Sequence, residues 1–462
     1  MSDTTSQFRV TFQPSGRNVY VLDGTKILEA AARAGMAINT PCGGQGTCGK
    51  CRVQVTAGAC NPCDHDRKIF SDKELKEGWR LACQTAVCGE TTVSVPASSI
   101  FAGKHQIVAS GGLAETRDVV PTVRKVYVEL TEPTLQDCEA DLLRLEQEVG
   151  TFGVDLSLLR EISYKLRHND FKGTAVLTDH KLIDFESGDT SGESWGVAFD
   201  IGTTTVVGVS LDLATGEEVA VASRMNPQVS YGDDVLSRIK HAGGCGDCLA
   251  ELHEGLVGEL VEMLDELCAE AGVKRERIYE AVFAGNTTME HLLAGVDPTQ
   301  LGEVPFAPVY GRGLIVPATE LDLPIHPRGN CCIFPVIGGF VGGDTVAGLL
   351  ATQLPAAKGP ALMIDIGTNG EIVLVHDGQV WAASTAAGPA FEGARIACGM
   401  RATQGAIEKV VMSDDIYCGV IGNVPPVGIC GSGLIDIIAE LLSIGVISPE
   451  GRLLPNDELP ES

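Results

Sequence analysis

The pattern of apolar and polar positions in the first hundred residues predicts a small domain of strands and short helices. Phe8–Phe12 and Val19–Val21 alternate on either side of a turn at Pro14–Gly16, which predicts an antiparallel hairpin. Thr25–Ala34 has apolar residues at helical spacing and is followed by Gly35, a residue typical of helix ends. The other elements expected here are a strand, a polar helix and two strands: Arg52–Val55, Asp72–Gly78, Leu81–Thr85 and Thr91–Val95.

The next stretch, from Phe101 to Ser194, has weaker periodicity and predicts a small α+β linker domain. Its expected elements are a strand, two helices and two short strands: Val119–Leu130, Leu135–Val149, Leu156–Leu166, Gly173–Leu177 and Lys181–Phe185. No pattern in this stretch indicates chemistry, so we expect it to hold its neighbours at a fixed reach.

Four cysteines have the spacing of an iron–sulfur ligand set. Cys42, Cys48 and Cys51 form a C-x5-C-x2-C run in a glycine-rich loop, and Cys83 follows at a distance. A [2Fe–2S] cluster needs four thiolates that converge on two irons, and glycines let the loop backbone adopt positive φ around them. A zinc knuckle would instead pair two C-x2-C units. The pattern therefore favours a [2Fe–2S] cluster on these four cysteines.

Two further C-x2-C pairs allow more than one interpretation. Cys60 and Cys63 fit either a second metal site or spare surface thiols, and we expect spare thiols because no further pair completes a site. Cys245 and Cys248, with His241 nearby, have the residue types of a metal site. They lie in a glycine-rich break before a helix, however, and there we expect a loop with free thiols.

A local pattern occurs twice in the second half of the chain. An apolar strand ends in Asp200, a Gly-Thr turn follows, and a second apolar strand comes next; the same order recurs around Asp365, 165 positions later (365 − 200). Such turns present N–H and hydroxyl donors to phosphate, while the strand-end aspartate can hold a hydrated Mg²⁺. Two facing turns would clamp a triphosphate, although a duplicated hairpin without a ligand remains the alternative. No P-loop motif is present.

Two glycine-rich turns open helices in the same region. Gly431, Ser432 and Gly433 open a helix, and Gly338–Thr345 similarly opens a helix at Val346–Leu350. A glycine-rich turn at a helix N-terminus gives a nucleotide access to backbone N–H groups, aided by the helix dipole.

These parts, in this order, resemble the phosphate-1, connect-1, phosphate-2 and adenosine motifs of the actin, sugar-kinase and chaperone ATPase (ASKHA) superfamily, with its ribonuclease-H-like fold. A β-grasp [2Fe–2S] ferredoxin region joined to this ATPase region resembles the reductive activators of corrinoid enzymes. The resemblance extends to Asn226–Val235, Gly285–Met289 and Ala387–Gly393. It implies ATP-dependent reduction of Co(II) to Co(I) in the corrinoid protein of a methyltransferase system, with electrons from an upstream donor.

The motifs assign expected roles to named residues. Asp200 and Asp365 are expected to position Mg²⁺ and water, while Asp344 or Glu392 either orients the attacking water or anchors the fold. The residues expected to contact ATP lie in the three glycine-containing turns: Gly202, Thr203, Thr204, Gly367, Thr368, Asn369, Gly431, Ser432 and Gly433.

Length and composition complete this picture. The 462 residues suffice for about three domains, which we place at 1–98, 99–193 and 194–462. A formal net charge of −27 repels phosphate backbones, so nucleic-acid binding is not expected. No apolar run reaches the ~18 residues that span a bilayer, and no signal peptide is recognisable. The 16 cysteines therefore indicate reduced thiols in the cytoplasm of an anaerobic or well-reduced cell.

The C-terminal end departs from the family pattern. ATPase domains of this family continue well past the adenosine motif, whereas this chain stops soon after Leu442, so we expect an incomplete second half-domain. Two other functions stay open: a redox-sensing small-molecule kinase or ATPase, and an electron carrier with a non-catalytic ATPase-like scaffold. The sequence does not fix the oligomeric state, and a homodimer is one option.

Overall fold

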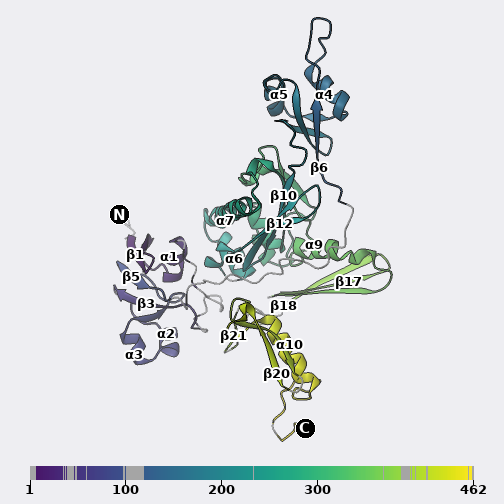
Figure 1. Cartoon of the computed structure of the whole chain (residues 1–462). Coiled ribbons are helices and arrows are strands. Elements are labelled where there is room, and N and C mark those ends of the chain that lie inside the picture. The colour runs from purple at the N-terminus through teal and green to yellow at the C-terminus, as the bar shows by residue number, and fades with distance from the viewer. Residues whose placement is uncertain are drawn as a thin grey trace.

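The protein is seen in a computed structural model as several packed units around a central sheet (Figure 1). The structure describes residues 7–34, 36, 38, 46, 49–58, 60–96, 99, 119–232, 234–367, 369–386, 396, 398–400, 402–412, 415–455 and 457–459. Within these ranges no helix is long and apolar enough to cross a membrane.

The N-terminal unit is a five-stranded sheet in the order β2-β1-β5-β3-β4. Its elements are β1 (Gln7–Gln13), β2 (Arg17–Leu22), α1 (Ile27–Arg33), β3 (Arg52–Ala57), α2 (Asp64–Ile69), α3 (Asp72–Lys76), β4 (Trp79–Leu81) and β5 (Thr91–Ser94). The expected hairpin is confirmed, because β1 pairs antiparallel with β2, while β5 runs parallel to β1. Phe12 and Ile27 are buried in the core between sheet and helix.

Two expectations for this unit are wrong. The strand expected at Leu81–Thr85 ends at Leu81, because the N–H groups of Gln84 and Thr85 both donate to the Leu81 carbonyl and turn the chain. Helix α2 was not expected at all. The buried Asp66 holds it in place by accepting hydrogen bonds from the Cys63 and Leu81 N–H groups, each at 2.8 Å.

The linker unit is a four-stranded sheet in the order β6-β8-β9-β7, packed against two helices. Its elements are β6 (Val123–Glu129), α4 (Asp141–Val149), β7 (Gly153–Val154), α5 (Leu156–His168), β8 (Lys172–Thr178) and β9 (Lys181–Ser187). The α+β expectation is confirmed, but α4 begins at Asp141 rather than Leu135. The preceding residues form a loop that the buried Arg144 holds through Asp137, with Nη2–Oδ1 at 2.6 Å.

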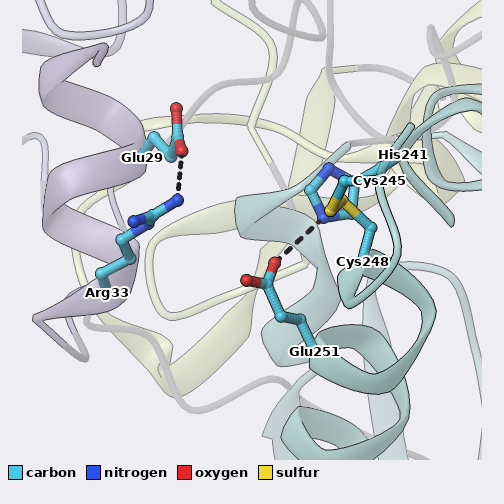
Figure 2. The surroundings of a disulfide bond; sticks show 6 residues. All are labelled: Glu29, Arg33, His241, Cys245, Cys248 and Glu251. Atoms are coloured by element: carbon cyan, nitrogen blue, oxygen red, sulfur yellow. Dashed lines mark hydrogen bonds and ion pairs between the residues drawn. A yellow bond between two sulfur atoms is a disulfide. The ribbon is translucent and has the colours of Figure 1, made fainter. Parts of the chain in front are cut away.

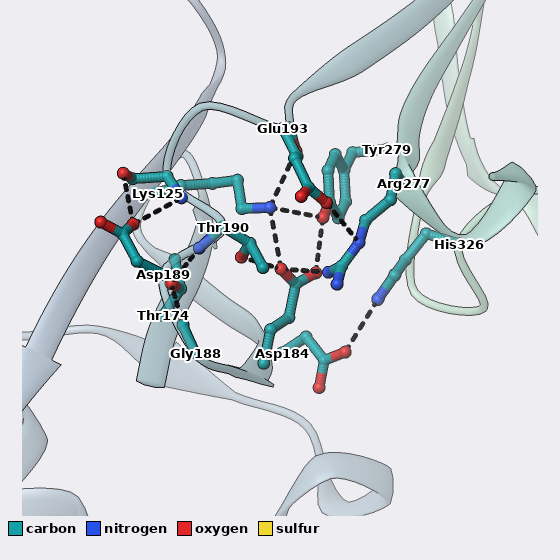
Figure 3. A network of polar contacts seen from close by, with 12 residues as sticks. Lys125, Thr174, Asp184, Gly188, Asp189, Thr190, Glu193, Arg277, Tyr279 and His326 are labelled. Carbon is teal, nitrogen blue, oxygen red and sulfur yellow. Dashed lines mark hydrogen bonds and ion pairs between the residues drawn. The ribbon is translucent and has the colours of Figure 1, made fainter. Parts of the chain in front are cut away.

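A network of buried charges joins the linker sheet to the central sheet (Figure 3). Lys125 of β6 forms a 2.8 Å ion pair with Glu186 of β9, and both side chains are buried. Tyr279 of the central sheet donates to Glu186, with the two oxygens 2.5 Å apart, and Arg277 also pairs with Glu186. Desolvation alone would raise the pKa of Glu186, but these donors hold it below its usual value. Buried charge is therefore compensated where the two units meet.

The central sheet has six strands in the order β12-β11-β10-β13-β15-β14. Its strands are β10 (Trp195–Ile201), β11 (Thr205–Asp212), β12 (Glu218–Met225), β13 (Ile278–Gly285), β14 (Leu314–Pro317) and β15 (Asn330–Ile333). The helices of this unit are α6 (Val235–Ala242), α7 (Cys248–Ala271), α8 (Thr287–Leu293) and α9 (Gly343–Thr352). Strand β13 runs parallel to β10, and α7 packs on β11 and β12 through leucines of its buried face.

The C-terminal region has two three-stranded sheets, β16-β17-β18 and β20-β19-β21. Its elements are β16 (Ala361–Ile366), β17 (Asn369–His376), β18 (Gln379–Ala386), β19 (Ala406–Met412), β20 (Ile416–Val420), β21 (Gly428–Ile429) and α10 (Gly431–Ser443). The second Asp-Ile-Gly-Thr segment, which begins at Asp365, thus forms a hairpin like the first, which begins at Asp200. These sheets and helices confirm the expected multidomain class of α+β and α/β units.

Candidate functional site

The first candidate turn is built by β10 and β11. Asp200 is the residue before the last in β10 and lies opposite Val207, and the Gly202 N–H donates to the Thr205 carbonyl at 2.9 Å. A Cβ at Gly202 would lie 2.6 Å from that carbonyl oxygen, so only glycine fits here.

Two asparagines, of which Asn226 is buried and Asn286 partly buried, hold this turn from neighbouring segments. The Asn226 amide donates to the Gly202 carbonyl at 2.9 Å, and the Asn286 amide donates to Thr203 Oγ1 at 2.9 Å. Asn226 belongs to the Asn226–Val235 segment, and Asn286 caps α8. The side-chain oxygen of Thr203 therefore has a fixed place, and its hydroxyl proton remains to be donated elsewhere.

The second candidate turn is built by β16 and β17. Asp365 lies opposite Glu371, and the Gly367 N–H donates to the Asn369 carbonyl at 3.1 Å. Thr368 lies outside the described residues. The two hairpins thus place an aspartate and a glycine at equivalent points of two different sheets.

Three aspartates come together from three elements. Desolvation raises the pKa of Asp200 to about 6, and the negative charges of Asp344 and Asp365 act in the same direction. The Asp200 side chain is nevertheless open to solvent. This desolvation therefore comes from protein atoms around an open site and not from full burial. The charges of Asp344 and Asp365 act on Asp200, so the ends of both hairpins and the start of α9 belong to one electrostatic neighbourhood.

The start of helix α9 approaches the start of α8 very closely, and this approach positions Asp344. A Cβ at Gly342 would lie 2.5 Å from the Asn286 Cα, so the backbones of α9 and α8 are in contact. Desolvation raises the pKa of Asp344, and the Asp365 charge contributes in the same direction. The pKa of Glu371 is raised to about 6, by desolvation first and by Asp344 next. Carboxylates gathered in this way are what a hard cation such as Mg²⁺ prefers as ligands.

Glu290 is a site residue that the sequence analysis missed. It lies in α8, is fully buried, and neither carboxyl oxygen makes a well-formed hydrogen bond with the described residues. Desolvation raises its pKa to about 9, the Asp344 charge adds to this, and the nearby Gly285 N–H opposes it. The available signal was an acidic residue within a helix whose residues are all buried.

The neighbouring His291 has a structural role. Its Nδ1 is 2.7 Å from the Thr287 carbonyl, and its Nε2 accepts a hydrogen bond from the Val309 N–H at 3.1 Å. Burial lowers its pKa, which agrees with a neutral ring protonated on Nδ1. His291 also stacks on Tyr310, with ring centroids 4.7 Å apart.

The third candidate turn opens α10. Gly431 is the first residue of the helix, and the Cys430 and Ser432 side chains lie 3.3 Å apart. A Cβ at Gly433 would lie 2.2 Å from the Ile407 carbonyl of β19, so packing alone requires this glycine. Contact of Gly431, Ser432 and Gly433 with a nucleotide stays a prediction.

Two of the four expected cluster cysteines are described, and the structure brings them together. The sulfur atoms of Cys51 and Cys83 lie 3.3 Å apart, and both residues are buried. Gly49, in the expected cluster loop, has a positive φ of 69°. A pair of adjacent thiols beside a glycine-dependent turn fits an iron–sulfur cluster. Cys42 and Cys48 lie outside the described residues, as does Glu392.

The remaining cysteines give mixed outcomes. Cys60 is buried and does not lie on the surface. Desolvation by burial raises the pKa of its thiol and keeps it neutral. Cys331 is buried in β15 and packs in the core of the central sheet. The free thiols expected at Cys245 and Cys248 are wrong, because the two form a disulfide, with Cα atoms 5.2 Å apart (Figure 2). A C-x2-C turn at a helix start allows free thiols, a disulfide or a metal site equally well.

Four family models match consecutive parts of the chain. They describe a 2Fe-2S iron-sulfur cluster binding domain, the RACo linker region, the RACo middle region and the C-terminal ASKHA domain of RACo, at residues 10–88, 112–192, 195–357 and 359–461.

Relatives agree with these models. The chain is 34% identical to corrinoid activation enzyme RamQ of Eubacterium limosum, over 98% of this chain and 73% of the relative. It is 26% identical to the [Co(II) methylated amine-specific corrinoid protein] reductase of Methanosarcina barkeri, over 58% of this chain and 55% of that protein. A solved reductive activator for a corrinoid, iron-sulfur protein is 38% identical, with a TM-score of 0.67, covering 97% of this chain and 74% of that one. The chain therefore belongs to the RACo family of corrinoid activation enzymes.

Proposed function

We propose that this protein reduces the Co(II) of a corrinoid protein to Co(I), using ATP and an electron from a [2Fe–2S] cluster. The observation that carries the proposal is the convergence of Asp200, Asp344 and Asp365 from two equivalent hairpins and one helix. The same chain contains an iron–sulfur domain. The corrinoid protein is that of a methyltransferase system, and an upstream donor reloads the cluster.

Cys42, Cys48, Cys51 and Cys83 would hold the cluster, which supplies one-electron transfer when bound. The buried pair Cys51 and Cys83 supports this assignment, with 3.3 Å between sulfurs. Gln84 Nε2 donates to the Cys83 sulfur at 3.7 Å.

Asp200 and Asp365 would hold Mg²⁺ and its water ligands. Their mutual repulsion with Asp344 supports this, because a divalent cation relieves the repulsion that raises the pKa of Asp200. Asp344 or Glu392 would orient the water that attacks ATP. The phosphates would be bound by backbone N–H groups and side chains of the two turns: Gly202, Thr203, Thr204, Gly367, Thr368 and Asn369.

The energy scale explains why the two activities share one chain. Plant-type clusters lie near −400 mV, and each ~59 mV uphill costs one electron about tenfold in equilibrium constant. A gap of roughly 100 to 200 mV to the Co(II)/Co(I) couple would need about 2 to 5 kcal/mol. A complete two-state switch needs about 5.5 kcal/mol of differential binding, so closure of two half-domains over ATP supplies enough.

The test is anaerobic absorption spectroscopy of a Co(II) methyltransferase corrinoid protein mixed with this chain and a chemical reductant. We expect the Co(I) spectrum only when MgATP is present. Cys83→Ser should abolish both the cluster absorbance and Co(I) formation, whereas Cys60→Ser, a matched buried thiol of the same domain, should retain both. A reducible cluster with no ATP effect on cobalt would contradict the proposal. Substrate-dependent ADP release without cobalt reduction would instead favour a redox-sensing kinase.

A further inference from the structure

The connection between α6 and α7 places four metal-ligating side chains together (Figure 2). His241 lies in the last turn of α6, Cys245 lies in the loop, and Cys248 is the first residue of α7. Glu251 follows three residues later, so it lies on the same helix face as Cys248. The proposed nucleotide and cluster sites use none of the four.

The distances between three of these side chains, His241, Cys248 and Glu251, fit one shared metal ion. The ligating atoms of His241, Cys248 and Glu251 all lie within 4.8 Å of one another. His241 Nε2 is 3.4 Å from Glu251 Oε2, which is long for a charge-assisted hydrogen bond. Two ligands at ~2.0–2.1 Å from a tetrahedral ion are separated by about 3.4 Å, the spacing seen here.

We propose that, when the Cys245–Cys248 disulfide is reduced, these two thiolates bind a zinc ion together with His241 and Glu251. Two sulfurs, one imidazole nitrogen and one carboxylate oxygen make a four-coordinate set of the kinds of ligand that zinc takes. The disulfide and the zinc site use the same two sulfurs, so one state excludes the other.

The reduced state is expected wherever the iron–sulfur domain works. Plant-type clusters operate at potentials below those of C-x2-C disulfides in redox proteins, so conditions that reduce the cluster also reduce this pair. A cellular dithiol would supply two electrons and two protons to the disulfide and would itself become a disulfide. Zinc would then displace the two thiol protons.

The burial of the four residues permits an ion to enter. Cys245 is exposed and Cys248 is buried, while the His241 and Glu251 side chains are partly exposed. The ring of His241 packs against Tyr231, with centroids 4.6 Å apart, which limits its rotation. Three of the ligands are therefore on helices and pre-positioned, and the exposed loop cysteine completes the set.

The site lies where the iron–sulfur domain meets the central domain. Helix α1 contacts the short helix at Pro227–Ser230, which immediately precedes Tyr231. The Tyr231 hydroxyl interacts electrostatically with Glu251 and with the α1 residues Arg33 and Glu29. Figure 2 shows Arg33 and Glu29 on the helix opposite the disulfide. Bound zinc would fix the α6–α7 loop at this junction.

The test uses full-length protein purified anaerobically with its cluster, with zinc and iron counted by mass spectrometry. Reduced wild-type protein should bind one zinc per chain in addition to its iron, and zinc-edge X-ray absorption should show two sulfur and two nitrogen or oxygen neighbours. Cys245→Ser should weaken zinc binding more than about 100-fold, beyond what loss of a supporting residue costs. Oxidation of wild-type protein with diamide should release the zinc.

Cys138→Ser, which removes an exposed free thiol of the linker unit, is the matched control and should bind zinc like wild type. Equal zinc binding by wild type and Cys245→Ser would overturn the proposal, as would absence of zinc from the reduced wild type. Zinc that appears only when iron is lost would mean occupation of the cluster cysteines, and would also overturn it. None of these readouts depends on cobalt reduction, so the zinc site can fail while the proposed function stands.

Discussion

The two Asp-Ile-Gly-Thr hairpins, β10–β11 and β16–β17, share a local sequence but differ in their surroundings. The first belongs to a six-stranded sheet, and its β10 residues Val197, Phe199 and Ile201 are at most 2% exposed. The second belongs to a three-stranded sheet, where Leu362, Ile364 and Ile366 of β16 are each more than 50% exposed. Local alternation and a Gly-Thr turn therefore suffice to set the hairpin, whereas burial depends on elements distant in the sequence.

The turns also differ in length. Residues 202–205 connect the paired Ile201 and Val206 in the first hairpin, while residues 367–369 connect Ile366 and Gly370 in the second. The second turn is thus one residue shorter, so two copies of one motif present donors differently. A ligand bound between them would meet two unlike sides.

The largest expected difference is in stability. Phe199→Ala should destabilise the central sheet by about 3–5 kcal/mol, because it removes a buried ring that stacks on Phe283 with centroids 5.5 Å apart. Ile364→Ala, at an exposed position, should change stability by less than about 1 kcal/mol. Urea unfolding followed by Trp195 fluorescence in β10, with Trp79 and Trp381 replaced by Phe, measures the first effect. The same design with Trp381 in β18 retained measures the second, and equal effects would remove the contrast between the two sheets.

Catalysis should not show this asymmetry. Asp200→Asn and Asp365→Asn should each lower ATP hydrolysis by about 100-fold or more, because each removes a charge from the proposed Mg²⁺ site. The iron–sulfur absorbance should stay unchanged in both variants. Asp377→Asn, in the exposed turn between β17 and β18, is the control and should hydrolyse ATP normally. Loss of the cluster in either aspartate variant would contradict separate modules.

At neutral pH and above, Glu290 should make the folded protein less stable than an uncharged residue at the same position would. Its pKa of about 9 in the folded protein lies above the 4.5 of an unfolded glutamate, so its contribution to stability is full below pH 4.5 and is lost progressively as the pH rises from 4.5 through 9. Glu290→Gln should therefore raise stability by about 1–2 kcal/mol at pH 7.5, and by more at pH 9.5. Urea unfolding at both pH values measures this, and destabilisation at both would show that the carboxyl is better satisfied than described.

The smallest expected effect is the pH dependence of the metal-free site. Asp200 has a pKa of about 6, above its usual 3.8, so its contribution is present below pH 3.8 and lost as pH rises through 6. The melting temperature without Mg²⁺ should fall between pH 5 and 7.5, and Mg²⁺ should reverse part of that fall. Asp200→Asn should flatten the pH dependence. A wild-type melting temperature that rises over this interval would be the opposite of the expected sign.

Much of the fold follows from the sequence because strong alternation and turn residues coincide. This holds for both Asp-Ile-Gly-Thr hairpins and for the β1–β2 hairpin. The failures have tertiary causes. Asp66 stabilises α2 by bonds to a distant strand, and Arg144 holds a loop where helical spacing alone predicted helix.

The site was predicted less completely than the fold. Asp200, Asp344 and Asp365 are recognisable because each follows or begins a distinctive turn, and the charges of Asp344 and Asp365 act on Asp200. Glu290 was missed because only the packing of α8 against α9 shows that its carboxyl lies against the start of α9 and interacts with the charge of Asp344. The Cys245–Cys248 bond was missed because spacing does not distinguish a disulfide from thiols.

The central claim is that both hairpins act on one nucleotide to drive cobalt reduction. Its most direct test is the rate of MgATP-dependent Co(I) formation on a Co(II) corrinoid protein by wild type, Asp200→Asn and Asp365→Asn, each with an intact reduced cluster. The account predicts Co(I) with wild type alone, and loss of the ATP-dependent rate in both variants. Full ATP-dependent Co(I) formation by either variant would contradict it.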